Sequence, residues 1–169
     1  MAAVTDYLKE CISDAILALV REKPLHKLTA EEIAQKAGVG RATFFRAFPS
    51  REEAVTFKFI RLWDRYAEQN GIRVRDRFDL NNALPFFRYN YSIRPLLKTV
   101  YDAGLMEALH ESFSRIMVPP ERTQDAAAAY RETFYAHGLY GLLEGWIRRD
   151  FRETPEQMAE TLLEIIQGQ

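Results

Sequence analysis

One stretch of the sequence has four basic side chains and no acidic one, and it is the segment best suited to contact a polyanion. Lys36, Arg41, Arg46 and Arg51 all lie between Ile33 and Arg51, a stretch that contains no aspartate or glutamate. Guanidinium and ammonium groups bind phosphate oxygens, and arginine also hydrogen-bonds the edges of DNA bases. The pattern therefore indicates chemistry suited to nucleic acid, although arginines that only solvate helix faces would give the same pattern.

The net charge of −1 conceals an uneven distribution of charge along the 169 residues. Residues 1–100 have 17 basic and 12 acidic side chains, a net charge of +5, whereas residues 101–169 have 6 and 12, a net charge of −6. A second basic cluster consists of Arg61, Arg65, Arg73, Arg75 and Arg77. Such a division is typical of a protein in which one part faces a polyanion and the other has a different task.

The composition excludes several other classes of protein. With 47% hydrophobic and 28% charged residues the chain is expected to fold rather than to remain disordered. A single cysteine, Cys11, rules out an internal disulfide and any multi-cysteine metal cluster. No apolar run approaches the ~18 residues of a membrane span, and the charged residues among the first 20 argue against a secretory signal. We therefore expect a soluble, cytoplasmic protein without a membrane partner, cofactor or metal.

The elements that must position the basic residues are all predicted to be helices. Apolar residues recur at helical spacing along the chain, and no alternating run predicts a strand. Thr29 with Glu32, and Ser50 with Glu53, have the spacing of capping boxes, and Gly38 suits the left-handed residue after a helix. The predicted helices span about 5–21, 30–37, 41–48, 51–68, 80–91, 93–103, 105–117, 121–150 and 155–167, with a linker at 70–82. The expected fold is all-α, with domains at 1–50 and 51–169.

Two of the short helices form a helix-turn-helix candidate around Gly38-Val39-Gly40. Its predicted core consists of Ile33, Ala34, Ala37, Val39, Phe44 and Phe48. The outward face of the second helix would then enter a DNA major groove, which is about 12 Å wide and admits one helix. The predicted DNA-binding residues are Thr29, Ala30, Arg41, Ala42, Thr43, Phe45, Arg46, Ala47 and Arg51. The pattern alone would also fit a helical hairpin within an ordinary bundle.

The sequence from Leu28 to Ala54 resembles the N-terminal domain of TetR-family transcriptional regulators. The residues that carry the resemblance are Thr29, Ile33 to Val39, Thr43 to Phe48 and Arg51 to Glu53. The resemblance implies a three-helix DNA-binding domain, a bridging fourth helix, and a helical ligand-binding and dimerisation domain. Three positions depart from the family pattern. Phe45 stands where the family usually has tyrosine, so a phenolic hydrogen bond to phosphate is missing. Ala47 stands where a histidine, tyrosine or asparagine often contacts the DNA backbone. Gly40 stands where a serine or threonine usually caps the helix.

A weaker resemblance concerns the end of the chain, where Gly138–Ile147 and Thr154–Met158 look like the last two helices of one group of these regulators. In that group the two helices pair with their copies in a dimer. Gly138, Gly141 and Gly145 would let another helix approach, although packing within one chain is the alternative. The predicted homodimer interface consists of Gly138, Leu139, Leu142, Gly145, Trp146, Leu162, Ile165 and Ile166.

Aromatic residues are frequent in the second half, where they favour either a plain core or a pocket for a small apolar or aromatic effector. The predicted ligand-binding residues are Phe86, Tyr89, Tyr101, His110, Phe113, Tyr130, Phe134 and His137.

The sequence gives little basis for an enzyme. Glu107 and His110 form one Glu-x-x-His step without the second copy that di-iron bundles use, and nothing orients His110 and Ser114 as a triad would require. A purely structural protein would not explain the acid-free stretch. The expected function is therefore a DNA-binding transcriptional regulator, a ligand-responsive repressor that binds a pseudo-palindromic operator in double-stranded DNA as a homodimer. An activator or co-regulator of the same fold is the alternative, and a helical-bundle enzyme a remote one.

Overall fold

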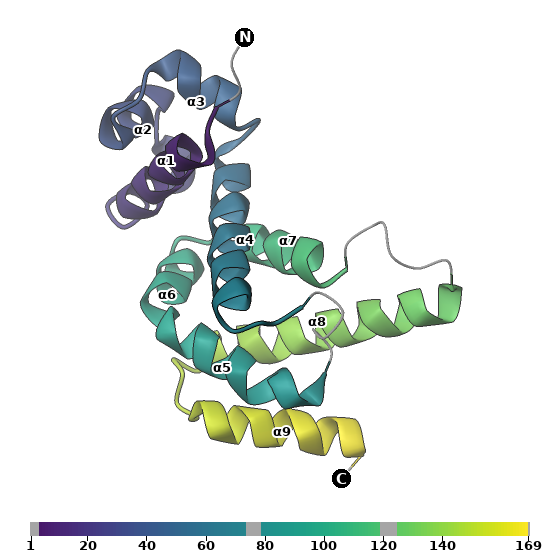
Figure 1. Cartoon of the computed structure of the whole chain (residues 1–169). Coiled ribbons are helices and arrows are strands. Elements are labelled where there is room, and N and C mark those ends of the chain that lie inside the picture. The colour runs from purple at the N-terminus through teal and green to yellow at the C-terminus, as the bar shows by residue number, and fades with distance from the viewer. Residues whose placement is uncertain (1–3, 74–78, 119–124, 169) are drawn as a thin grey trace.

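The computed structural model describes residues 4–73, 79–118 and 125–168, and within these ranges the chain is helical and has no strand (Figure 1). The α-helices are α1 (Asp6–Leu19), α2 (Ala30–Ala37), α3 (Arg41–Ala47), α4 (Arg51–Gln69), α5 (Ala83–Ser92), α6 (Arg94–Asp102), α7 (Met106–Met117), α8 (Ala126–Arg148) and α9 (Pro155–Gln167). The all-α prediction is confirmed. Residues 121–124 of the predicted helix 121–150, and 74–78 of the predicted linker, lie outside the described residues.

Local capping chemistry defines the helices that matter most for the site. The backbone N–H of Glu32 donates to Thr29 Oγ1 over 3.2 Å, and the N–H of Thr29 donates to Glu32 Oε2 over 2.8 Å, which confirms this capping box. Gly38 ends α2 with φ of 67°, a left-handed conformation that glycine adopts without a steric penalty. The second predicted box is only half formed, because Ser50 accepts from the Glu53 N–H while Arg115 of α7 holds the Glu53 carboxylate.

Helix α4 connects two helical bundles (Figure 1). The first bundle contains α1, α2 and α3, and the second contains α5 to α9. On one side of α4 the buried Ser13 hydroxyl of α1 donates to the Ala54 carbonyl over 2.7 Å. On another, the buried Thr56 hydroxyl donates to the Ala108 carbonyl of α7 over 3.1 Å. The bridging fourth helix that the resemblance implied is therefore hydrogen-bonded to both bundles.

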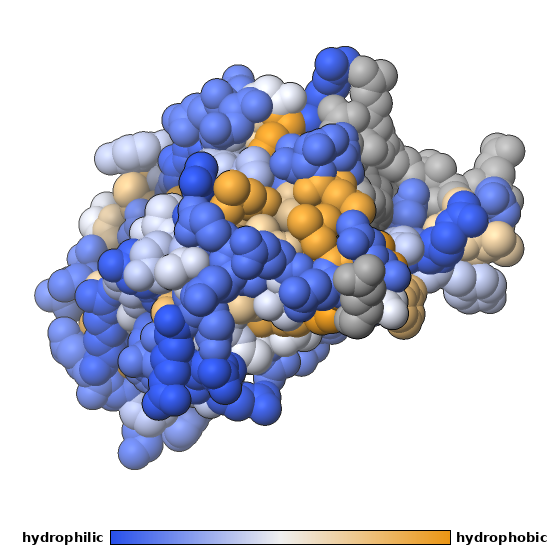
Figure 2. All heavy atoms as spheres, turned by 90° about the horizontal axis from the view of Figure 1, so that it is seen from below, coloured by the Kyte–Doolittle hydropathy of each residue, from blue (hydrophilic) through white to orange (hydrophobic). Residues whose placement is uncertain are grey.

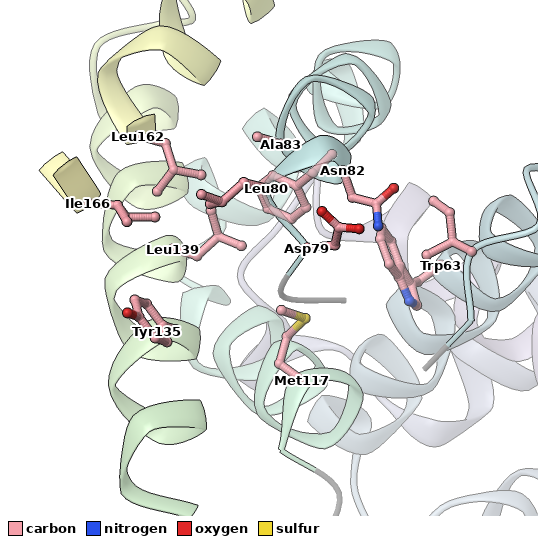
Figure 3. Close-up of a pocket in the computed structure, with 12 residues that line it drawn as sticks. Trp63, Asp79, Leu80, Asn82, Ala83, Met117, Tyr135, Leu139, Leu162 and Ile166 are labelled. Carbon is pink, nitrogen blue, oxygen red and sulfur yellow. The ribbon is translucent and has the colours of Figure 1, made fainter. Parts of the chain in front are cut away.

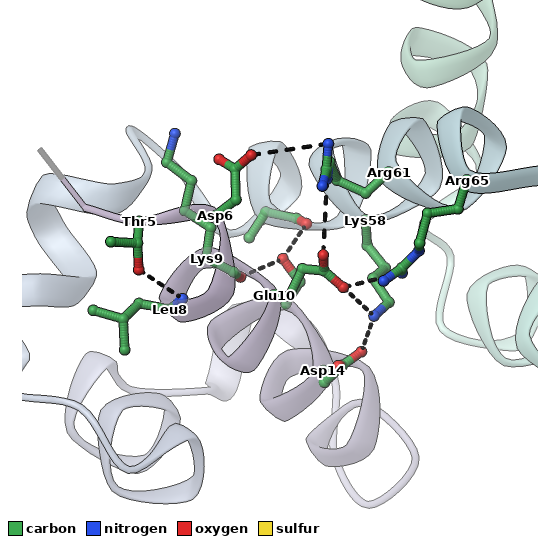
Figure 4. A network of polar contacts seen from close by, with 11 residues as sticks. Thr5, Asp6, Leu8, Lys9, Glu10, Asp14, Lys58, Arg61 and Arg65 are labelled. Carbon is green, nitrogen blue, oxygen red and sulfur yellow. Dashed lines mark hydrogen bonds and ion pairs between the residues drawn. The ribbon is translucent and has the colours of Figure 1, made fainter. Parts of the chain in front are cut away.

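Ion pairs also join α4 to α1 (Figure 4). Lys58 lies 2.7 Å from the Asp14 carboxylate, and both Lys58 and Arg65 pair with Glu10. Burial opposes ionisation of Glu10, but the charges of Arg65 and Lys58 outweigh it and hold the pKa of that carboxyl below its ordinary value of 4.5. Arg61 likewise lies 3.7 Å from Glu10. Arg61 and Arg65, two members of the second basic cluster, therefore pair with acidic residues of the same chain. Two other members, Arg75 and Arg77, lie outside the described residues.

The core of the second bundle surrounds Trp146 of α8, which is 1% exposed. Its ring stacks on Tyr91 and meets Phe87 and Phe151 edge-on, and its Nε1–H donates to the Glu153 carbonyl over 3.0 Å. A side chain enclosed by its own chain offers no area to a second one, so the prediction of Trp146 as an interface residue is wrong. No helix in the described ranges is long and apolar enough to cross a membrane.

Candidate nucleic-acid interface and effector pocket

Helices α2 and α3 form the helix-turn-helix unit at the outer end of the first bundle (Figure 1). Ile33, Ala34, Phe44 and Phe48 are buried in its core, as the sequence predicts, and Ala37 and Val39 pack partly buried against it. The outer side of α3 exposes Arg41, Ala42, Phe45 and Arg46, with Thr43 half-buried among them. The fold therefore leaves most of the predicted base-reading side chains facing away from the protein.

Ala47 is the exception on α3. Its side chain is 9% exposed and belongs to the core cluster, so the prediction that it faces DNA is wrong. The physical reason is the helical repeat. Ala47 and Phe48 follow Phe44 by three and four residues and therefore lie on the same face, which is the buried one.

A surface hollow of about 540 Å³ opens beside this face. It is lined by the turn Leu25–Lys27, the first residues of α2, parts of α3, and the beginning of α4. Basic groups reach it from Lys27, Arg41 and Arg51, and Glu52 is its one acidic lining residue among those described. The sequence reasoning missed His26 and Lys27, which also line it; the signal was their position just before the Thr29 capping box.

Two features make this hollow suitable for phosphate. The N-termini of α2 and α4 both open into it through Thr29, Ala30, Ser50 and Arg51, and helix N-termini present backbone N–H groups to anions. In addition, Arg51 Nε is buried without a hydrogen-bond partner in the described part of the chain. The guanidinium group of Arg51, a half-buried residue that lines the hollow, adds a charged hydrogen-bond donor beside these backbone N–H groups.

The second bundle contains a cavity of about 240 Å³, close to the lower range of small-molecule sites (Figure 3). Its lining residues come from five helices, from the turn Leu80–Asn82 and from Ile72 and Asp79 outside these elements: Trp63, Ile72, Asp79, Leu80, Asn82, Ala83, Phe86, Met117, Tyr135, Leu139, Leu162 and Ile166. Of the predicted ligand-binding residues only Phe86 lines it. Phe86, Tyr89 and Phe113 also line a second cavity of about 30 Å³, where burial raises the pKa of Tyr89 well above 10.

The remaining predicted ligand-binding residues lie outside both cavities. His110 Nε2 and His137 Nδ1 are 3.2 Å apart between α7 and α8, and Tyr101 lies on α6 beneath the ammonium of Lys98. Tyr130 and Phe134 point outward from α8, with 77% and 74% of each side chain exposed. None of these five predicted ligand-binding residues lines either cavity, because helical spacing alone does not say which face of a helix turns towards a cavity.

Five residues of the predicted dimer interface lie either at the cavity or on the surface, whereas Leu142 and Gly145 are half-buried. Leu139, Leu162 and Ile166 line the cavity, whereas Ile165 and Gly138 are exposed. A Cβ added to Gly138, Gly141 or Gly145 would meet no atom within 4 Å, so the chain itself does not fill the space beside these glycines. Seen from below, the side on which α9 lies, the molecule also has an apolar area near its centre (Figure 2).

The comparisons with known families agree with this architecture. Residues 12–55 match the model described as "Bacterial regulatory proteins, tetR family", and residues 88–168 match the model described as "Transcriptional regulator C-terminal region". No curated protein matches the chain significantly. The two matched segments include the helix-turn-helix unit and most of the second bundle. The chain belongs to the TetR family of bacterial regulatory proteins, and its function is DNA-binding transcriptional regulation.

Proposed function

We propose that this regulator is a ligand-responsive repressor that binds a pseudo-palindromic operator as a homodimer. The observation that carries the proposal is the outward face of α3 beside a hollow that combines three basic side chains with two helix N-termini. Two copies of α3 would enter successive major grooves about 34–36 Å apart. Such a role places the protein with the chromosome, in the cytoplasm, and gives it no catalytic task.

The contacts divide into two kinds in this proposal. Among the residues that line the hollow, those that hold the phosphate backbone are His26, Lys27, Thr29, Ala30 and Arg51. Arg41, Ala42, Thr43, Phe45 and Arg46 face the bases. Backbone contacts fix the register of the protein on the duplex, whereas contacts to base edges select the sequence. Residues 1–50 would form the DNA-binding domain, and residues 51–169 the regulatory domain.

The cavity of the second bundle is the proposed effector site. Trp63 of α4 forms one of its walls, and Leu139 and Tyr135 of α8 form another (Figure 3). An apolar or aromatic effector would therefore touch the helix that leads to the DNA-binding bundle and the helix proposed to meet the second subunit. The effector would bind more tightly to a conformation of the dimer in which the two α3 helices no longer match successive major grooves. The difference in its affinity for this conformation and for the DNA-binding one sets how far the equilibrium shifts away from DNA binding.

The proposed dimer face combines exposed residues of α8 and α9. Tyr130 and Phe134 on α8, and Ile165 on α9, are large residues with 59% to 77% of their surface exposed. The open space beside Gly138 and Gly141 continues this face along α8. Aromatic residues are enriched at protein interfaces, and small residues allow helices to approach closely.

The test is selection of duplexes from a random DNA pool, followed by titration of the selected duplex. Wild-type protein should bind one pseudo-palindromic sequence, and combining Arg41→Ala with Thr43→Ala should abolish the preference while leaving weak binding to any DNA. Arg152→Ala is the matched control, because this exposed arginine lies between α8 and α9, at the other end of the molecule (Figure 1). Intact sequence preference in the paired variant would refute the proposal.

A further inference from the structure

Phe45 presents an apolar ring on an otherwise polar, basic surface. It lies near the middle of α3 with 58% of its side chain exposed, although its neighbours Phe44 and Phe48 are buried. Ala42, three residues earlier, is exposed on the same face. The exposed face of α3 therefore has a small apolar patch that consists of the Phe45 ring and the Ala42 methyl group.

The surroundings of this patch identify what would cover it. Arg41 and Arg46 flank it on α3, and the ring also lines the hollow that contains Lys27 and Arg51. Positive charge of this density fits a polyanion rather than an apolar protein surface. The phenyl ring has no hydroxyl group, so it cannot hydrogen-bond a phosphate or a base edge. Its contact with the polyanion must therefore be an apolar one.

A DNA major groove offers one exposed apolar group, the C5-methyl of thymine. Resting on the proposed function, we propose that Phe45, with Ala42 beside it, is a specificity-determining residue that reads thymine methyl groups in each operator half-site. The Arg41 guanidinium carbon lies 5.6 Å from the Phe45 ring centre, and Phe44 meets the ring edge-on at 5.3 Å. These two contacts hold the ring in place without covering its exposed side.

The test replaces single thymines of the selected duplex by deoxyuridine, which pairs with adenine in the same way and lacks only the methyl group. Replacing the thymine of one half-site should weaken wild-type binding about fourfold, and replacing the matching thymines of both half-sites should weaken it roughly fifteenfold. Replacement by 5-bromodeoxyuridine should restore binding, because bromine is similar in size to a methyl group.

The variants assign this effect to the ring. Phe45→Ala should bind the thymine duplex more weakly and lose all discrimination between thymine and deoxyuridine, and it should fold normally because the ring is exposed. Arg51→Ala is the matched control, since it should weaken binding to both duplexes equally and keep the fourfold difference.

The inference is overturned if no thymine replacement affects wild-type protein, or if Phe45→Ala discriminates as the wild type does. Those results would leave the proposed function intact, provided that a specific duplex is selected. Failure to select any duplex would instead refute the proposed function, and the inference with it.

Discussion

At the scale of single residues, Arg51 shows how one side chain can prepare a surface for an anion. Its Nε is buried without a hydrogen-bond partner among the described residues, and its backbone begins α4. The positive end of the helix and the guanidinium group therefore act at the same place. Because the Ser50 hydroxyl already accepts the Glu53 N–H, the other N–H groups of this first turn remain for an oxygen from outside the helix.

We expect Arg51→Ala to weaken DNA binding by a similar factor on every sequence, because the residue would contact phosphate and no base. The slope of log affinity against log salt concentration should fall by roughly one unit, as one fewer counterion is released. Titrations at several salt concentrations, with the selected duplex and with a scrambled one, measure both effects. A loss confined to the selected duplex would show instead that Arg51 reads a base.

Glu32 is the second residue whose surroundings lead to a prediction. A hydrogen bond from Lys23, and further ones from the backbone and hydroxyl of Thr29, lower the pKa of Glu32 from 4.5 to about 2. A carboxylate whose pKa is lower in the folded protein stabilises the fold above its unfolded pKa. That contribution is lost as the pH falls from about 4.5 to about 2.

Glu32→Gln should therefore be less stable than wild type at pH 7, and the difference should disappear as the pH approaches 2. Urea denaturation at a series of pH values measures it. Glu31→Gln is the control, because Glu31 lies in the same helical turn and is exposed. A difference between wild type and Glu32→Gln that stays constant down to pH 2 would contradict the assigned hydrogen bonds.

At the scale of elements, α4 determines whether the two bundles behave as one unit. It is hydrogen-bonded to α1 through Ser13 and to α7 through Thr56, and Glu53 in its first turn pairs with Arg115 of α7 at 2.6 and 2.9 Å. Residues of α4 belong to the apolar cores of both bundles. If either bundle unfolded, the apolar side chains of α4 that pack against it would be exposed to water.

Ser13→Ala and Thr56→Val should each lower the free energy of unfolding by about 1 kcal/mol, since each removes one buried hydrogen bond. Both tryptophans, Trp63 and Trp146, lie outside the first bundle, so their fluorescence reports on α4 and the second bundle. We expect the fluorescence and circular dichroism transitions to coincide in both variants.

The control for these variants is Thr161→Val, whose hydroxyl donates to a carbonyl of its own helix and which should change the free energy by less than about 0.5 kcal/mol. If Ser13→Ala shifts the dichroism transition and leaves the fluorescence transition in place, the bundles unfold independently.

The same scale explains how much the sequence could predict. The bounds of α2 and the conformation of Gly38 depend on capping residues within a few positions, so local patterns were sufficient. The cavity, in contrast, depends on how helices that are distant in the sequence pack together.

Adjacent residues of α8 differ in their surroundings, because Tyr135 lines the cavity and Phe134 points outward. Trp146 likewise became a core residue through contacts with α5 and the segment after α8. Periodicity identifies an apolar stripe and does not identify its partner.

At the scale of the whole molecule, only part of the positive charge of residues 1–100 is placed where it could contact DNA. Arg61 and Arg65 pair with acids of α1, so part of the positive charge of residues 1–100 stabilises the junction between α1 and α4 (Figure 4). The basic side chains proposed to contact DNA, Lys27, Arg41, Arg46 and Arg51, lie instead on α3 and at the hollow beside it.

The N-terminal half of α8 projects beyond the second bundle (Figure 1), and a second subunit would cover its exposed aromatic residues. Phe134→Glu should therefore convert a dimer into a monomer at micromolar concentration, because it places a charge in the proposed apolar contact. Sedimentation velocity measures the change, and the helical dichroism should be unaffected. Tyr7→Glu is the control, since Tyr7 is 75% exposed but lies on α1. A wild-type protein that is monomeric at this concentration would refute the two-half-site arrangement.

The cavity and the exposed face of α8 share one helix. Tyr135 and Leu139 line the cavity, and the residues that precede them in the sequence, Phe134 and Gly138, are exposed. A ligand that rotates or shifts α8 would then alter the association constant of the subunits, and by thermodynamic reciprocity association would alter the affinity for the ligand by the same factor. The half-saturating effector concentration should accordingly vary with the total protein concentration, so the sensitivity of the response would depend on how much regulator the cell makes.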